Sequence, residues 1–237
     1  MEFAHVSVLL QESLDGLRIR PDGIYVDGTA GGAGHSREIA KRLTTGRLIA
    51  FDQDPDAVKT AAERLAPYPQ AEVVHDNFRN MASRLEERQA LPVDGVLLDL
   101  GVSSWQLDNP ERGFSYREDA PLDMRMSKEG ETAAELLARA SESEIARILW
   151  EYGEERYSRQ IARKIVEKRE KEPVLTTFQL ADLIKSAMPA AARREKNPCK
   201  RSFQALRIAV NSELDALSNG IDAAFDCLSE GGRLCII

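Results

Sequence analysis

The sequence predicts an α/β protein with a doubly wound, mostly parallel sheet and a small helical domain inserted into it. Over roughly the first hundred residues, short apolar runs alternate with helix-like segments, as in chains of βαβ units. The apolar runs are nearly continuous, for example Gly95-Val96-Leu97-Leu98, which is typical of strands buried on both faces. Residues 132–196 show no strand pattern, and this stretch indicates the inserted helical domain.

Each element of the sheet domain has its own signal. Strands are expected at the apolar runs over residues 24–26, 47–51, 72–74 and 93–100. Apolar residues at positions 58, 61, 62 and 65 repeat at helical spacing, which predicts a helix over Pro55–Leu65. Proline suits the first turn of a helix, and Asp54 directly before it is a suitable N-cap.

The rest of the chain predicts helices and one last strand. Helices are expected over residues 132–139, 142–171 and 177–187, with a capping box between Ser141 and Glu144. Apolar residues from Phe203 to Leu228 step by three and four positions, which predicts a single long helix. Gly231-Gly232 would end this helix, and residues 233–237 would form a strand. Because the sequence stops inside that strand, we expect the protein to continue beyond Ile237.

The expected domain boundaries follow from these elements. Residues 103–127 are rich in Pro, Gly, Asp, Arg and aromatic residues without a clear period, which indicates an ordered loop or a domain crossing. The sheet domain would comprise residues 1–105 and 201–237. A linker loop and the inserted helical domain would occupy residues 106–200.

Composition indicates a globular protein and excludes several classes. The 237 residues are 43% hydrophobic and 30% charged, an ordinary balance for a folded chain. No basic leader precedes an apolar stretch, and no apolar run is long enough to span a bilayer. The three widely spaced cysteines fit neither a disulfide framework nor a zinc site. We therefore expect a cytoplasmic protein with reduced thiols, no metal and no membrane contact.

The charge distribution is ambiguous about nucleic acid. The net charge of −7 disfavours a polyanionic partner. Six cations nevertheless fall within fifteen positions that hold one acid, Glu195; they are Arg193, Arg194, Lys196, Lys200, Arg201 and Arg207. This block predicts a basic, RNA-binding face, although a solvated loop is the simpler interpretation of the block alone. Trp105, Phe114 and Tyr116 would either stack on RNA bases or pack between domains.

A glycine-rich loop follows the first strand and reads VDGTAGGAGHS over residues 26–36. A strand that runs through glycines into a helix lets the backbone approach a ligand closely at the carboxyl edge of the sheet. The dinucleotide fingerprint is incomplete, because Arg37 stands where its third glycine belongs, and no Gly-Lys-Ser/Thr phosphate loop follows.

Polar residues also end the neighbouring strands. Asp52 ends the second strand, where an acid can accept hydrogen bonds from both hydroxyls of a ribose. The third strand ends in His75-Asp76-Asn77-Phe78, which offers polar groups and a ring to an adenine, and Asp99 ends the fourth. Because parallel strands end at one edge, these residues together predict a nucleoside-binding site.

Several segments resemble the family of small-subunit ribosomal RNA cytosine-N4 methyltransferases. Besides the glycine loop, the matching segments are HVSVLLQE from His5, LDLGVSS from Leu98, QLD from Gln106, RGFS from Arg112, PLDMRM from Pro121, and RSFQALRI from Arg201 with Val210-Asn211. The resemblance implies a Rossmann-like methyltransferase fold with S-adenosylmethionine as cofactor. It also implies methyl transfer to the N4 amine of a cytidine in 16S rRNA, near the decoding centre of the small ribosomal subunit.

The resemblance also implies which residues form the site. Cofactor contacts carried over by position are Gly32, Ala33, Gly34, His35, Asp52, Phe78, Asp99 and Gln106. Asp52 would bind the ribose, Phe78 would lie on the adenine side, and Asp99 and Gln106 would lie on the methionine side. His35 is expected to be a cofactor contact and not a base.

The acceptor chemistry makes Asp99 the candidate catalytic group, with Ser103 and Ser104 as helpers. A cytosine amine is a poor nucleophile, and acceptors on its N–H groups would favour a more tetrahedral nitrogen and take up the proton. Three alternatives stay open: a nicotinamide-dependent oxidoreductase, a non-catalytic cofactor-binding module in ribosome assembly, and a methyltransferase that acts on DNA or protein. The sequence is also compatible with a homodimer.

Overall fold

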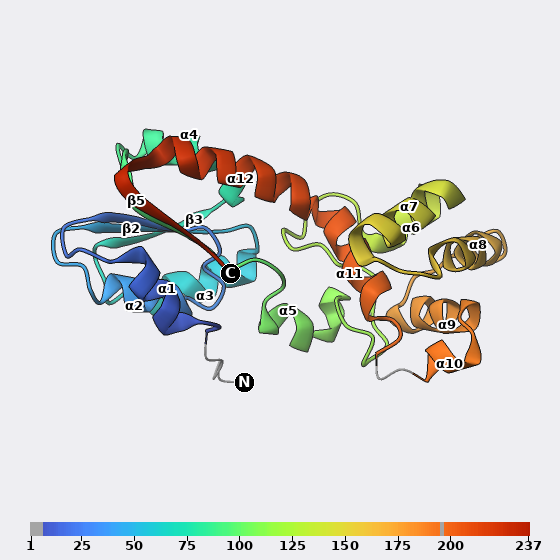
Figure 1. Ribbon diagram of the computed structural model, residues 1–237. Helices are drawn as coiled ribbons and strands as arrows, with labels where there is room; N and C mark the ends of the chain where they lie inside the picture. The colour runs from blue at the N-terminus through green and yellow to red at the C-terminus, as the bar shows by residue number, and fades with distance from the viewer. Residues whose placement is uncertain (1–6, 195–196) are drawn as a thin grey trace. The chain divides into compact units, whose positions relative to one another are not determined.

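The computed structural model describes residues 7–194 and 197–237, and within them five strands form one parallel sheet (Figure 1). The strands are β1 (Ile24–Asp27), β2 (Arg47–Asp52), β3 (Ala71–His75), β4 (Val93–Leu98) and β5 (Leu228–Ile236). Their order across the sheet is β3-β2-β1-β4-β5, and every neighbouring pair is parallel. The predicted α/β class with a parallel sheet is confirmed.

The chain divides into two compact units. The sheet unit comprises Met1–Gly101 and Leu214–Ile237, and the helical unit comprises Val102–Glu213. The boundaries expected from the sequence, 1–105, 106–200 and 201–237, differ from this division chiefly at one helix, α11 (Lys200–Asn211), which lies in the helical unit.

Helices cover both faces of the sheet, as Figure 1 shows. They are α1 (Leu10–Leu17), α2 (Gly34–Ala40) and α3 (Pro55–Leu65) on one face, and α4 (Met81–Glu87) and α12 (Glu213–Cys227) on the other. Consecutive strand residues alternate between the two cores, since Tyr25 packs into the first and Val26 into the second. The cap of α3 is confirmed, because the Asp54 carboxylate accepts the Asp56 N–H at 3.0 Å.

The helical unit has a hydrophobic core of its own. Its helices are α5 (Ser104–Asp108), α6 (Ala133–Arg139), α7 (Glu142–Gly153), α8 (Ser158–Arg169), α9 (Thr177–Ala187), α10 (Ala190–Arg193) and α11. Short 3₁₀ turns are η1 (Phe78–Asn80) in the sheet unit and η2 (Pro110–Arg112) here. Thr132 and Thr176 start α6 and α9 with capping boxes, and Ser141 caps α7 by accepting the Glu144 N–H at 3.2 Å.

Two predicted helices are wrong because each is broken in two. Glu154 adopts a left-handed conformation with φ of 50° and ends α7, so the helix expected over 142–171 is α7 followed by α8. Ser212, with φ of 46°, separates α11 from α12 in the same way. The strand expected over 233–237 begins already at Leu228, so Gly231-Gly232 lie inside its range instead of ending the helix.

The buried face of α12 also differs from the predicted apolar stripe. Small residues face the core, namely Ala216, Gly220, Ala224 and Cys227. The side chains of Leu214 and Phe225 are 49% and 66% exposed. The spacing of apolar residues continues across the break at Ser212, but it does not mark the buried face of α12.

Neither disulfides nor membrane-spanning helices occur in the described residues. The three cysteines are free thiols, with Cys199 and Cys227 buried. Burial raises the pKa of Cys199 to about 11, so this thiol is protonated and unreactive at neutral pH. Over residues 7–194 and 197–237, no helix combines the length and the apolar character needed to cross a bilayer.

The crossing of α7 and α11 gives a prediction for Gly153→Ala. A Cβ at Gly153 would lie 2.5 Å from the backbone oxygen of Arg201 and 3.0 Å from the Cβ of Ala205. Helix propensity alone would favour alanine by about 1 kcal/mol, but overpacking costs roughly 1–3 kcal/mol. We expect a net loss of unfolding free energy in urea, with Glu151→Ala on the exposed side of α7 within about 0.5 kcal/mol of wild type. A stabilised Gly153→Ala variant would contradict this packing.

Candidate functional site

The loop between β1 and α2 is fixed at the carboxyl edge of the sheet from both sides. The Gly28 N–H donates to the Leu97 carbonyl of β4 at 2.8 Å, and the Ala30 N–H donates to the Phe51 carbonyl of β2 at 2.8 Å. On the β4 side, the Thr29 hydroxyl also accepts the backbone N–H of Asp99 at 2.7 Å. The loop is therefore an extension of the sheet and not a free connection.

Asp27 holds the loop together from inside. Its buried carboxylate accepts the Ser36 hydroxyl at 2.6 Å and the Thr29 N–H at 3.1 Å. Burial raises the pKa of Asp27, and these two hydrogen bonds oppose the rise. Sequence reasoning did not assign this role. The available signal was an acid at the strand end, followed by a hydroxyl residue in the first turn of the next helix.

The glycine positions are needed for close approach. A Cβ at Gly28 would lie 2.4 Å from a methyl carbon of Leu98, and one at Gly34 would lie 2.0 Å from the Ser7 hydroxyl oxygen. Ala33 between them is buried and left-handed, with φ of 59°. The backbone here is packed too closely for larger side chains.

Arg64 of α3 fixes the middle of the loop. Its guanidinium donates to the Gly32 carbonyl at 2.6 Å. Sequence reasoning missed this residue, because nothing in the helix pattern of α3 distinguishes Arg64 from a solvent-exposed arginine.

Half-buried Asp52 accepts two hydrogen bonds from the backbone. One carboxylate oxygen accepts the Gly31 N–H at 2.8 Å and the other accepts the Asp54 N–H at 2.8 Å. Burial raises the pKa of Asp52 to about 6, against the lowering effect of these two bonds. A carboxylate has about four lone-pair sites, so this group can accept two further hydroxyl groups, as the diol of a ribose requires.

His35 and Asp99 lie at the opposite side of the loop. The Nε2 atom of buried His35 is 3.1 Å from the Val8 carbonyl oxygen, which only accepts, so Nε2 carries the proton. Its Nδ1 atom faces a carboxylate oxygen of Asp99 at 3.9 Å. Because the backbone N–H of Asp99 is bonded to the Thr29 hydroxyl, the loop holds the main chain of Asp99, and the His35 ring lies beside its carboxylate.

Polar side chains at the end of β3 form hydrogen bonds with neighbouring residues of the sheet unit. Asp76 accepts hydrogen bonds from Arg84 at 2.6 Å and Asn80 at 2.7 Å. Burial would raise the pKa of Asp76, but these bonds hold it below its usual value. Half-buried Phe78 packs against α12, where a Cβ at Gly220 would lie 2.4 Å from its ring.

In the helical unit, Ser103 and Gln106 form a capping box. The Gln106 side-chain oxygen accepts the Ser103 N–H at 3.0 Å, and the Ser103 hydroxyl accepts the Gln106 N–H at 3.2 Å. Ser104 is the first residue of α5, and Gln106 is buried. The geometry shows that Ser103 and Gln106 start this helix.

The cations predicted to bind RNA differ in their surroundings. Arg193, Arg194, Lys200 and Arg201 are exposed, whereas Arg207 is 19% exposed and forms a bidentate pair with Glu213 at 2.7 and 2.9 Å. Lys196 lies outside the described residues. Of the aromatic candidates, Phe114 is buried, Tyr116 packs edge-on against Phe203 at 5.0 Å and Trp105 is 37% exposed.

Two residues within the resemblance are structural in a way that the sequence did not indicate. Buried Arg112 donates to the carbonyls of Arg125 and Met126, both at 2.9 Å. Asn211 donates to the Met124 carbonyl and accepts the Met126 N–H, both at 2.7 Å. The matched segments that begin at Arg112, Pro121 and Arg201 therefore hold one another inside the helical unit.

Comparisons with known proteins give a consistent result. The model of the MraW methylase family matches residues 2–237. Ribosomal RNA small subunit methyltransferase H of Clostridium botulinum (strain Kyoto / Type A2) is 52% identical over 100% of this chain and 77% of its own length. The protein of that name from Heliobacterium mobile is 53% identical over 100% of this chain and 78% of its own length.

Among solved structures, an rRNA methylase from Streptococcus thermophilus is 22% identical to this chain, with a TM-score of 0.35. The match covers 41% of this chain and 58% of that one.

The residues of the sheet unit fit S-adenosylmethionine. Asp52 suits a ribose diol, and the backbone from Gly28 to Gly34 is closely packed at the edge where the strands end. Asp99 adds a carboxylate at the β4 end, where it is partly exposed. These carboxylates offer hydrogen-bond acceptors that suit a nucleoside with a positively charged substituent.

The bond between Thr29 and Asp99 gives a prediction with a matched pair of variants. Thr29→Val keeps the shape but removes the acceptor of the Asp99 N–H, whereas Thr29→Ser keeps the hydroxyl. We expect Thr29→Val to lose about 1–3 kcal/mol of unfolding free energy and to bind cofactor more weakly, with Thr29→Ser close to wild type. Denaturant unfolding and calorimetry measure both effects. Equal behaviour of the two variants would refute the importance of this bond.

The raised pKa of Asp52 predicts that cofactor affinity depends on pH. The carboxylate form accepts ribose hydroxyls, so affinity should be full above about pH 7 and fall through pH 6, approaching about tenfold per pH unit below it. Titration calorimetry from pH 5 to pH 8 tests this. Asp52→Asn should bind weakly with no step near pH 6, and a step that survives in this variant would assign the effect to another group.

Proposed function

The chain belongs to the MraW methylase family, and from this premise we propose that it methylates the N4 amine of a cytidine in 16S rRNA, near the decoding centre of the small ribosomal subunit. It is an S-adenosylmethionine-dependent rRNA methyltransferase. The observation that carries the proposal is identity of 52% across the whole chain, both units included, with proteins named for methylation of small-subunit ribosomal RNA.

The cofactor is proposed to lie on the loop that Asp27 closes. Asp52 would accept the ribose hydroxyls, Phe78 would lie beside the adenine, and Gly32, Ala33, Gly34 and His35 would contact the rest through the closely packed backbone. When bound, S-adenosylmethionine supplies a methyl group that the acceptor nitrogen attacks in line with the departing sulfur.

Positioning is the largest contribution that these residues can make. Holding the amine and the methyl carbon in line supplies about 7–11 kcal/mol of barrier reduction. Asp99 is proposed to accept a hydrogen bond from the amine and then its proton, which moves the nitrogen lone pair out of conjugation with the ring. Ser103 and Ser104 are proposed as helpers, because they follow Asp99 closely in the chain. Gln106 is proposed for the methionine end of the cofactor on sequence grounds.

The RNA is proposed to reach the enzyme through exposed cations. Arg193, Arg194, Lys200 and Arg201 are available for phosphate contacts. Arg207 is engaged by Glu213, so its proposed contact with RNA requires that pair to open. The target base would leave its stack to present N4 to the cofactor. Because the proposed substrate is a ribosomal subunit, we propose that the enzyme acts in ribosome biogenesis in the cytoplasm.

Methyl transfer from labelled S-adenosylmethionine to small subunits that lack their modifications tests this function. We expect label in N4-methylcytidine after nucleoside analysis, and Asp99→Ala should lower the rate by roughly 10²–10⁴-fold. Full turnover by Asp99→Ala with normal cofactor affinity would remove Asp99 from the mechanism. Label in DNA or protein would identify a different acceptor, and cofactor binding without transfer would favour an assembly module. Sedimentation of the same sample tests for a homodimer.

A further inference from the structure

Three arginines that do not belong to the predicted RNA-binding block form a cationic surface at the start of α8. This α8 arginine surface consists of Arg156 in the turn before the helix and of Arg159 and Arg163 within it. All three side chains are exposed. Because Arg159 and Arg163 are four residues apart in one helix, they lie on the same side, one turn from each other.

Among the described residues, Arg156 and Arg159 lack the acidic partner that many other cations of this protein have, and Arg163 has only a distant one. Elsewhere, Glu38 pairs with Lys41 at 2.6 Å, and Glu172 pairs with Lys168 at 2.5 Å. Within residues 7–194 and 197–237, no carboxylate lies within ion-pair distance of Arg156 or Arg159. Arg163 reaches Glu142 only at 3.9 Å. Like charges four residues apart in a helix, as Arg159 and Arg163 are, are unfavourable in the free protein, and an anionic ligand would remove this repulsion.

The N-terminus of α11 extends the cationic surface. Gly153 is in tight contact with the backbone of Arg201, and the Arg201 guanidinium donates to the Glu154 carbonyl at 3.1 Å. Arg201 therefore lies beside the turn that carries Arg156, and Lys200 precedes it as the first residue of α11.

Glu154 and Glu155, the two acids of that turn, differ in how far they offset the positive charge of the α8 arginine surface. Glu155 is buried, and its carboxylate accepts the Ser202 hydroxyl at 3.3 Å and the Tyr157 N–H at 3.1 Å. Its charge is therefore directed into the helical unit, and Glu154 is the exposed acid at this turn.

We infer that the α8 arginine surface binds the phosphate backbone of the RNA substrate and orients it for methyl transfer. The inference rests on the proposed function, which supplies a polyanionic substrate. Guanidinium groups bind phosphate oxygens in a bidentate manner, and phosphate contacts fix register and orientation without reading sequence. The surface therefore acts on affinity for the RNA and leaves the chemical step unchanged.

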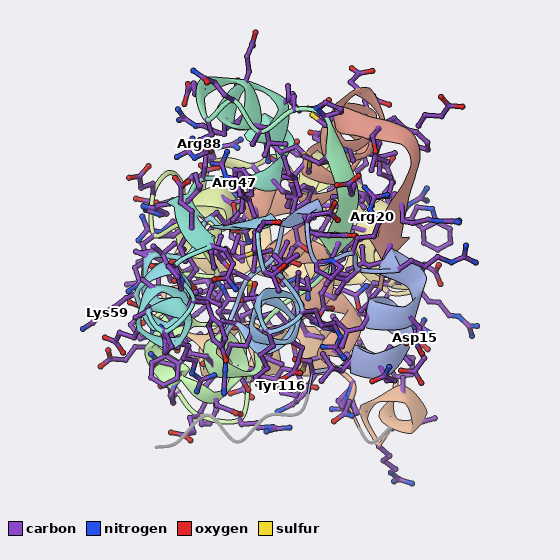
Figure 2. All side chains as sticks on the ribbon, turned by 90° about the vertical axis from the view of Figure 1, so that its left-hand side faces the viewer. Asp15, Arg20, Arg47, Lys59, Arg88 and Tyr116 are labelled. Carbon is purple, nitrogen blue, oxygen red and sulfur yellow. The ribbon has the colours of Figure 1, made fainter. Side chains whose placement is uncertain are left out.

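A triple variant and a matched control test this inference. Arg156→Gln, Arg159→Gln and Arg163→Gln are combined in one protein. Lys59→Gln, Lys171→Gln and Arg233→Gln form the control, which removes the same charge at exposed positions; Figure 2 shows Lys59 extending outward from α3. Binding to unmodified small subunits is measured from low to high salt, together with cofactor affinity and methylation kinetics.

The α8 variant should lower the slope of log affinity against log salt by about 2–3, since each phosphate contact contributes roughly 0.7–0.9. At low salt its affinity for subunits should fall at least about tenfold and KM should rise. The values of kcat and of cofactor affinity should stay within about twofold of wild type, and the control should match wild type throughout. A variant indistinguishable from the control would overturn the inference, as would equal losses of kcat and cofactor binding.

The same measurements separate this inference from the proposed function. If the wild-type protein transfers no methyl group but the α8 variant loses its salt-dependent binding to subunits, the surface is confirmed and the enzymatic proposal fails. If methylation proceeds and the α8 variant binds like the control, the enzymatic proposal is supported and the surface inference is wrong.

Discussion

The buried carboxylate of Asp27 sets the shape of the loop that carries the proposed cofactor contacts from Gly32 to His35. A carboxylate removed from water is unfavourable by several kcal/mol unless hydrogen bonds replace its hydration. The Thr29 N–H and the Ser36 hydroxyl supply two such bonds, and they stand at opposite ends of the glycine segment. The hydrogen bonds to Asp27 therefore close the loop. Asp52 and Asp99 then bond to loop residues whose positions these bonds fix.

Motif residues in the helical unit act in the same manner, since they satisfy buried backbone groups. Arg112 and Asn211 bind carbonyls of the segment that ends at Met126, and Gln106 binds the backbone of Ser103. A residue within a recognisable motif can thus be held by internal bonds and not by a substrate. The distinction matters most for Arg207, whose ion pair with Glu213 competes with any phosphate.

The sheet and its edge could be predicted because both depend on short-range patterns. The apolar runs predicted β1 to β4, and the acids at the ends of two of these runs predicted that Asp52 and Asp99 lie at the carboxyl edge of the sheet. The helix breaks at Glu154 and Ser212 could not be predicted, since both are left-handed residues other than glycine and the apolar spacing continues across them. Arg64 was missed for another reason: its contact with Gly32 joins separate elements and leaves no local signal.

The parallel pairing of β4 with β5 has a consequence for how the protein is made. Val96 and Leu234 are neighbours in the sheet, although the whole helical unit separates them in the chain. During synthesis the helical unit is contiguous and can fold as it leaves the ribosome, whereas β4 must wait for its last partner with one edge unpaired. Long-range parallel pairing is slow, and unpaired strand edges are prone to aggregation. The rate of elongation through residues 102–213 thus sets how long a nascent chain is exposed to this risk.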